Sequence, residues 1–158
     1  MFRQMRRIKQ QISKEECIRI LKEEPRGVLA VLGDDGYPYT VPLDHWYCEE
    51  NGKLYFHCAK EGHKIDAIKK CNKVSYCVMD KGYKNPGEWA INFNSVVVFG
   101  KMSFVEDDEL TLKICIDMSR KFTDDEEYIK KEIRDSLAHV LCLELTPEHI
   151  SGKFVNEA

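Results

Sequence analysis

Short apolar runs separated by turn sequences dominate the first third of the chain. The runs lie at residues 28–32, 37–47 and 54–58. The sequence Asp34-Asp35-Gly36 joins the first two, and Glu49-Glu50-Asn51-Gly52 joins the second to the third. The glycine in each turn can take the positive φ that tight turns require. This pattern predicts an antiparallel meander of three strands.

Helical spacing of apolar residues predicts four helices. Ser13–Glu16 forms a capping box, and the helix that follows should end near Glu24 because Pro25 disfavours helix at the residue before it. A short helix is predicted over residues 62–71. Acidic runs, which are typical of helix N-termini, precede two further amphipathic helices; the runs are 106–109 and 124–127.

Three further segments have the composition of strands. Residues 74–78 are the first, and residues 89–104 form a long β stretch that is either one strand or two. Gly100 indicates a bulge within this stretch. Residues 140–145 alternate as a last strand, which Pro147 should end. About six strands, with helices at the ends and in one crossover, predict a mainly β, α+β barrel.

Composition narrows the class of protein. The 158 residues, of which 43% are hydrophobic, fit one domain over residues 1–158 with a barrel core at about 25–146. The net charge of -3 argues against a dedicated nucleic-acid binder. No apolar run approaches the ~18–20 residues that span a bilayer, and no apolar segment of a secretory signal follows the basic N-terminus. We therefore expect a cytoplasmic protein that binds neither nucleic acid nor membrane.

Seven cysteines are scattered through the apolar segments. Their odd number and the absence of a CxxC pair argue for reduced, mostly buried thiols rather than disulfides. No Cys/His group has the spacing of a zinc site. The cysteines are Cys17, Cys48, Cys58, Cys71, Cys77, Cys115 and Cys142.

The segment His57–Lys64 leaves a predicted strand and enters a predicted helix. Free backbone N–H groups and the positive end of the helix converge at such a junction, and Lys64 adds a full charge. This combination favours a phosphate. Between Lys60 and Lys84 there are seven lysines against three acids, so the local field is positive. The alternative is a solvated helix face on which Lys64 is an ordinary surface residue.

The predicted strand Tyr39–Asp44 contains Pro42, which cannot donate to a ladder. The strand should therefore lie at an edge, a bulge or a barrel opening. The unpaired amides of an edge can bind a planar heterocycle. The alternative is a plain edge strand that proline protects from further pairing.

Three other chemical interpretations are weaker. His57 and His63 are too few for a metal site, and we expect none. His57 and Cys58 point to opposite faces of a strand, which argues against a nucleophilic pair. A basic cluster near the N-terminus could bind RNA or lipid headgroups, but a solvated terminus is expected; its residues are Arg3, Arg6, Arg7 and Lys9.

The order and spacing of several segments resemble the FMN-binding split-barrel superfamily. After the Arg-Arg start and the capped helix, these segments are Gly36–Leu43, Tyr55–Asp66 and Ser95–Lys101. Within the superfamily, the chain is most similar to the branch related to pyridoxamine 5'-phosphate oxidase that contains the nitroimidazole-resistance proteins. The resemblance extends from about Met5 to Leu145.

The resemblance implies a six-stranded antiparallel Greek-key split β-barrel and a homodimer with two FMN molecules at the subunit interface. It places FMN-binding residues along the flavin ring, beside the ribityl phosphate and around the phosphate itself. Those along the ring are Tyr39, Thr40, Val41, Pro42, Leu43, Asp44 and Ser95; beside the phosphate are His57 and Cys58, and around it His63 and Lys64. The C-terminal Trp and Arg contacts of the true oxidase have no counterpart after Val140, which argues against vitamin B6 oxidation.

The leading functional hypothesis is an FMN-dependent oxidoreductase. It would take a hydride from NADH or NADPH and reduce a small electrophile such as a nitroaromatic. No residue is a convincing general acid, so no catalytic residue is named. A partner chain would cover the flavin with aromatics such as Trp89 or Phe93. The alternatives are a non-catalytic flavin- or haem-binding carrier or sensor, with His57 or His63 as an axial ligand, and a deazaflavin enzyme.

Overall fold

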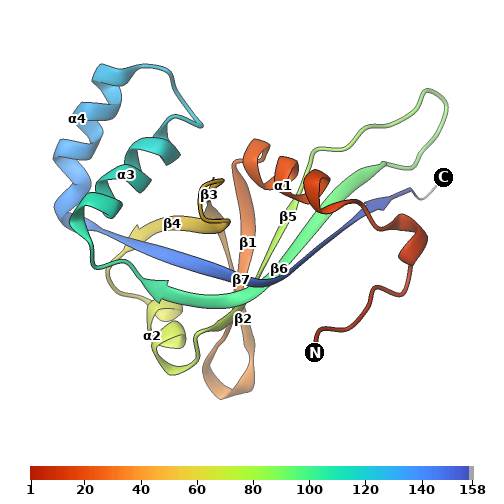
Figure 1. Ribbon diagram of the computed structural model, residues 1–158, viewed down its shortest axis with the longest axis horizontal. Coiled ribbons are helices and arrows are strands. Elements are labelled where there is room, and N and C mark those ends of the chain that lie inside the picture. Colours follow the sequence, from red (N-terminus) through yellow and green to blue (C-terminus); the bar gives the residue numbers. More distant parts are fainter. Residues whose placement is uncertain (157–158) are drawn as a thin grey trace.

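The computed structural model describes residues 1–156 (Figure 1). Seven strands form one curled antiparallel sheet, in the order β2-β1-β5-β6-β7-β4-β3. This mainly β half-barrel with flanking helices confirms the predicted fold class. The strands are β1 (Arg26–Leu32), β2 (Pro38–Asp44), β3 (Trp46–Cys48), β4 (Lys53–Ala59), β5 (Lys73–Met79), β6 (Phe93–Phe104) and β7 (Val140–Val155).

Four α-helices flank the sheet, and all four were predicted. They are α1 (Lys14–Glu23), α2 (His63–Lys70), α3 (Asp108–Ser119) and α4 (Glu126–Ser136), with short 3-10 turns at Ile8–Gln10, Asp34–Gly36 and Leu137–His139. Ser13 caps α1 by accepting the Glu16 N–H at 3.1 Å, as the capping box predicts. Asp107 and Asp125 cap α3 and α4 in the same way. Local sequence therefore determines where these helices begin.

The strand count differs from the prediction because the segment 37–47 is two strands. The chain bends at His45, so β2 pairs with β1 while β3 pairs with β4 at the opposite edge of the sheet. Past the bend at His45, strands β2 and β4 approach one another but form no ladder. This unpaired seam is the split of the barrel.

The last strand does not end at Pro147, which corrects the prediction. β7 continues to Val155 and pairs with β6 over nearly all of its length. Pro147 is tolerated because it lies opposite Gly100, where the register of the pair shifts. The predicted irregularity at Gly100 is thereby confirmed, although the extra residue, Glu148, lies in β7 rather than in β6. Residues 93–104 are one strand.

Two apolar clusters hold the fold together. The larger fills the concave side of the sheet beneath α1 and α2 and includes Leu29, Phe56 and Tyr76. The smaller lies under α3 and contains Tyr55, together with Cys48, Ile114, Cys115, Met118 and Cys142. All seven cysteines are free and four of them are buried, as predicted. Among residues 1–156, no helix has both the length and the apolar character needed to cross a membrane.

Candidate functional site

The strand β2 provides a free edge at the split. It pairs with β1 alone, so half of its backbone groups point away from the sheet. The side chains of Tyr39, Val41 and Leu43 pack against the core. The intervening Thr40, Pro42 and Asp44 therefore face outward. A ligand at this edge would meet backbone groups and these outward side chains.

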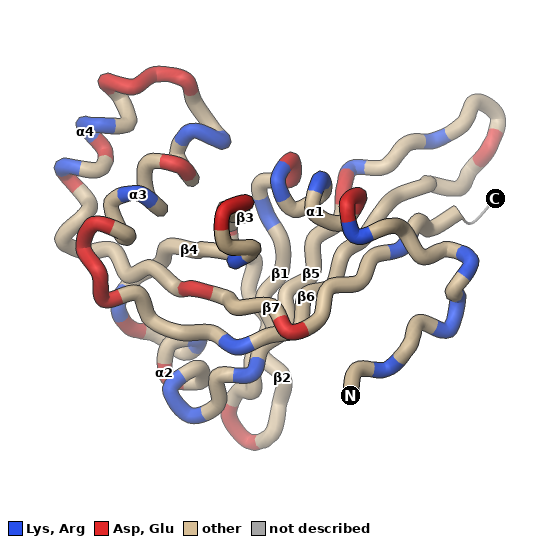
Figure 2. Tube along the Cα trace, viewed as in Figure 1, with Lys and Arg blue, Asp and Glu red and all other residues tan. Residues whose placement is uncertain are grey.

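The N-terminus of α2 lies at the end of the split where β2 begins, because His63 stacks on Tyr39. Gly62 takes φ +134° before the helix, and no side chain caps the first turn, so the first N–H groups remain available to a ligand. Lys64 is half-buried in this turn and makes no ion pair or side-chain hydrogen bond within residues 1–156. Other lysines lie on α2 and just before it (Figure 2), so the region is electropositive.

Aromatic and ionic contacts tie α2 to the β1–β2 turn. The His63 ring stacks on Tyr39 with ring centroids 4.1 Å apart. Its Nε2 lies 3.8 Å from Asp34 Oδ2, and Lys70 Nζ lies 3.5 Å from Asp34 Oδ1. These contacts place the start of α2 beside the free edge of β2.

His57 on β4 and Asp44 on β2 lie close enough across the split to interact electrostatically. Burial lowers the pKa of His57, and the nearby Asp44 carboxylate opposes this shift. Asp44 is itself bound by Arg26, with Nε 2.6 Å from Oδ1. Burial raises the pKa of Cys58, while the Lys64 ammonium acts in the opposite direction, so Lys64 lies near the end of β4. The net downward shift of the His57 pKa favours the neutral imidazole near pH 7.

The structure brings ten of the eleven predicted binding residues to the split. They are Tyr39, Thr40, Val41, Pro42, Leu43, Asp44, His57, Cys58, His63 and Lys64. Ser95 is not among them, because β1 and β5 separate β6 from β2. At ~4.8 Å per strand this separation is about 14 Å. Ser95 lies instead in a hollow beside the N-terminal segment.

Sequence reasoning missed His45, which is fully buried beside the split. Its Nε2 lies 2.7 Å from the Leu21 carbonyl oxygen and its Nδ1 2.8 Å from the Tyr76 hydroxyl. The Tyr76 hydroxyl oxygen also lies 2.7 Å from the Leu43 carbonyl oxygen, so its single proton is shared between this carbonyl and Nδ1 of the neutral His45. Burial, assisted by the nearby Lys121, lowers the pKa of His45 to about 3. His45 thus connects α1, β2 and β5 as a neutral hydrogen-bonding group.

Lys121 anchors the helical hairpin α3–α4 to the barrel. Its Nζ donates to the carbonyl oxygens of Glu24 at 2.8 Å and His45 at 2.7 Å. Burial lowers the pKa of Lys121 to about 8, against the attraction of Asp44 and Glu24. No periodicity or spacing in the sequence indicates this long-range contact. Among the described residues, no three His, Cys, Asp or Glu side chains gather as metal ligands.

A family model described as pyridoxamine 5'-phosphate oxidase matches residues 13–154. The chain belongs to this family. Membership agrees with the half-barrel described above and with the resemblance in the order of segments along the chain. No curated protein matches the chain.

Solved structures of other proteins share the fold. A candidate 5-nitroimidazole antibiotic resistance protein from Bacteroides thetaiotaomicron is 22% identical, with TM-score 0.74, over 91% of this chain and 86% of that one. An FAD-binding protein from Mesorhizobium loti is 24% identical, with TM-score 0.65, over 92% and 97%. An FAD- and haem-binding protein from Mycobacterium smegmatis is 19% identical, with TM-score 0.73, over 94% and 74%. At these identities the likeness concerns the fold.

Proposed function

We propose that the protein is an FMN-dependent oxidoreductase that takes a hydride from NADH or NADPH and reduces a small electrophile such as a nitroaromatic. The observation that carries this proposal is the free edge of β2 beside the uncapped N-terminus of α2 with Lys64. FMN combines a planar ring that has a hydrogen-bonding edge with a terminal phosphate, so its two ends match these two features. Family membership and the FAD-binding relatives support a flavin.

Most of the predicted binding residues have a role in this arrangement. Lys64 and the first N–H groups of α2 would hold the phosphate, with the stacked His63 fixing the start of the helix. Backbone groups of β2 would contact the polar edge of the ring and stabilise negative charge on it. When bound, the flavin supplies the hydride and electron transfer. His57, as a neutral ring at the split, would orient the cofactor by hydrogen bonding.

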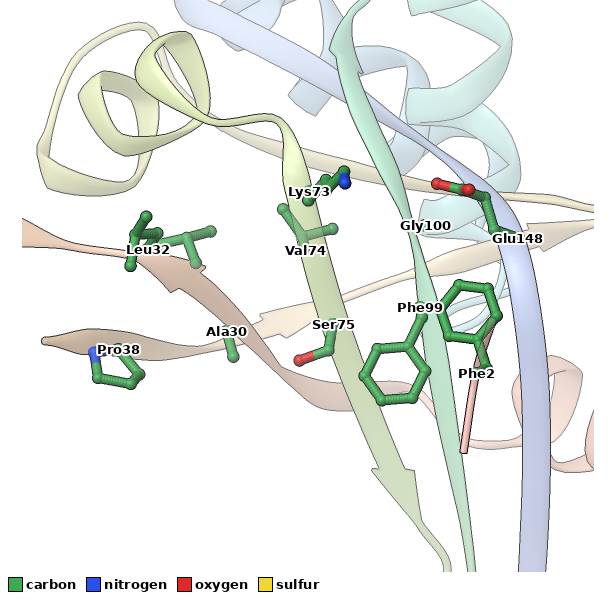
Figure 3. Close-up of a pocket in the computed structure, with 11 residues that line it drawn as sticks. Phe2, Ala30, Leu32, Pro38, Lys73, Val74, Ser75, Phe99, Gly100 and Glu148 are labelled. Atoms are coloured by element: carbon green, nitrogen blue, oxygen red, sulfur yellow. The ribbon is translucent and has the colours of Figure 1, made fainter. Parts of the chain in front are cut away.

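The homodimer is part of the proposal. The convex face of the sheet exposes Val28, Leu32, Met79 and Phe99, which are 42%, 53%, 63% and 39% accessible. Figure 3 shows this face around a hollow, with Leu32 and Ala30 on β1, Ser75 on β5 and Phe99 on β6. A second copy would bury this surface.

Such a pairing also gives Ser95 a role, because this residue lies on the convex face and could reach a flavin held by the other subunit. Trp89, on the loop before β6, is 78% accessible and is available to cover that flavin. Phe93 begins β6 beside this loop.

The seven free thiols support a reducing compartment, so a cytoplasmic location is included in the proposal.

A carrier or sensor without turnover is the second candidate. His57 is a neutral imidazole that borders a cavity, and a neutral imidazole can ligate haem iron. One relative of the same fold is an FAD- and haem-binding protein. An absorption spectrum separates the candidates, because flavin bands support the first and a Soret band the second. Mass spectrometry of the released ligand separates FMN from FAD or a deazaflavin.

The proposed reaction is tested by anaerobic titration of the purified flavoprotein. NADH or NADPH should bleach the flavin absorbance, and a nitroaromatic should restore it. Pyridoxamine 5'-phosphate should be a poor substrate, because burying its phosphate without a second basic group is costly. Rapid oxidation of this compound would contradict the proposed substrate class. Flavin that neither nicotinamide donor reduces would favour the carrier or sensor.

A further inference from the structure

A cavity of about 280 Å³ lies between β4 and the hairpin of α3 and α4. The hairpin stands away from the sheet beside the end of β4 (Figure 1). His57 and Val140 line the cavity from the sheet, and Ile129 and Ile133 line it from α4. The smaller apolar cluster closes it below, since Cys115 belongs to both. No residue of this cavity except His57 belongs to the proposed flavin site.

The shape and lining of the cavity suit an aromatic ring. Phe122 and Tyr128 also line it and are 53% and 54% accessible, so each offers an exposed ring face or edge to a ligand. The hydroxyls of Ser119 and Ser136 already donate to helix carbonyls at 2.7 and 2.6 Å. The polar groups left for a ligand are therefore those of His57, Glu132 and the hydroxyls of Thr123 and Tyr128.

The charge around the cavity disfavours an anion. Glu132 is the one lining residue with a full charge near pH 7, since His57 is neutral and neither lysine nor arginine lines the wall. The carboxylate of Asp44 lies near His57 but is already paired with Arg26, so Glu132 sets the charge of the cavity. A carboxylate or phosphate in the cavity would meet the Glu132 carboxylate and would find no basic partner in the lining. An amine or a neutral hydrogen-bond donor would be favoured.

We propose that this cavity binds a neutral or cationic aromatic molecule and is the acceptor site of the enzyme. The role as acceptor site rests on the proposed function, because His57 borders both the cavity and the split that would hold the flavin. The binding of the aromatic molecule to the cavity does not depend on the proposed oxidoreductase function. This inference places substrate selection in the hairpin, which sequence patterns identify only as two amphipathic helices.

Three matched probes test the charge preference at pH 7: 4-nitrobenzyl alcohol, 4-nitrobenzylamine and 4-nitrobenzoate. Their binding to the purified protein is measured by calorimetry without any nicotinamide donor. The alcohol and the amine should bind, and the benzoate should bind about tenfold more weakly or not at all. Equal affinity for all three probes would overturn the charge preference and with it the proposal.

Two variants locate the binding in the cavity. Phe122→Ala should weaken binding of the alcohol and the amine about three- to tenfold, while Leu112→Ala, an exposed change on α3 outside the cavity, should not. Glu132→Gln should reduce the preference for the amine about two- to fivefold, while Glu127→Gln on the same helix should leave it unchanged. Variants that behave like their controls would overturn the inference.

Turnover distinguishes this failure from failure of the proposed function. If nitroaromatics reoxidise the reduced flavin at the same rate in Phe122→Ala and the wild type, the flavin reaction stands and the cavity is not its acceptor site. If the probes bind with the expected pattern but the flavin is never reduced, the binding site stands and the oxidoreductase proposal is wrong.

Discussion

Lys64 is the residue on which the proposed flavin site depends most. It stands in the first turn of α2 with no ion pair or side-chain hydrogen bond within the described residues. Lys64→Ala should therefore weaken FMN binding about ten- to a hundredfold, because a charge-assisted contact contributes ~1.5–3 kcal/mol. Quenching of flavin fluorescence on titration with the apoprotein measures the affinity.

Lys69→Ala is the matched control, because Lys69 is an exposed lysine in the last turn of the same helix. It should change affinity by less than about threefold, as expected for a distant surface charge. Equal losses in both variants would mean that only the diffuse positive field attracts the phosphate.

His45 should make the stability of the protein depend on pH. Its pKa is about 3 in the folded chain, against ~6.5 when unfolded, so between these values the unfolded chain binds more protons. The stabilisation is complete above pH ~6.5 and is lost as the pH falls toward 3. From pH 7 to pH 5 the contribution should fall by about 2 kcal/mol.

Urea denaturation of the wild type and of His45→Gln at pH 7, 6 and 5 measures this slope. The variant should be less stable at pH 7 and should lack this share of the pH dependence. His139→Gln, a change at an exposed histidine, should retain it. A slope that is the same in His45→Gln and the wild type would show that another group causes the pH dependence.

The two residues differ in how far the sequence reveals them. The position of Lys64 at a strand-to-helix junction follows from neighbouring residues, so the sequence predicts both its place and its role. The partners of His45 are Leu21 and Tyr76, which lie 24 and 31 positions away. Only the folded sheet brings them together, so no local pattern can indicate this network.

At the scale of elements, the pair β6 and β7 is the longest in the sheet, and its register shifts between Phe99 and Gly100. A Cβ at position 100 would collide with the Thr146 carbonyl group. Gly100→Ala should therefore destabilise the protein by about 1–3 kcal/mol, since neighbouring backbone must move. The midpoint of urea denaturation measures the change, and Ser103→Ala, at an exposed position of β6, is the control.

The same pair shows why strand ends are harder to predict than helix starts. Caps are made by residues three positions apart, as in Ser13 and Glu16, and the sequence contains both partners. The end of β7 depends on a register shift between Pro147 and Gly100, which stands 47 positions earlier in the chain. The sequence indicated the bulge and the proline separately, but not that they face each other.

In the whole molecule one face of the sheet is covered throughout and the other only in part. Helices α1 and α2 and the core cover the concave side. On the convex side the N-terminal segment contributes Phe2, which stacks on Phe99 at 5.4 Å and on His149 at 4.9 Å. Helix α3 covers Tyr55 and Cys142 on this side, while Val28, Leu32 and Met79 remain exposed. Alternation along the strands predicts that two faces exist, but not which face another chain covers.

If the convex face is the dimer interface, the protein should scatter light with twice the 18.4 kDa mass of one chain. Val28 lies near the middle of that face on β1 and is 42% accessible. Val28→Glu should weaken dimerisation more than about a hundredfold, because a buried, unpaired carboxylate costs ~3–5 kcal/mol. Flavin affinity should fall together with dimerisation if the cofactor lies at the interface.

Leu112→Glu, on the distant helix α3, is the control and should leave mass and flavin content unchanged. A wild-type mass near 18.4 kDa at micromolar concentration, with flavin still bound, would show that one chain holds the cofactor alone.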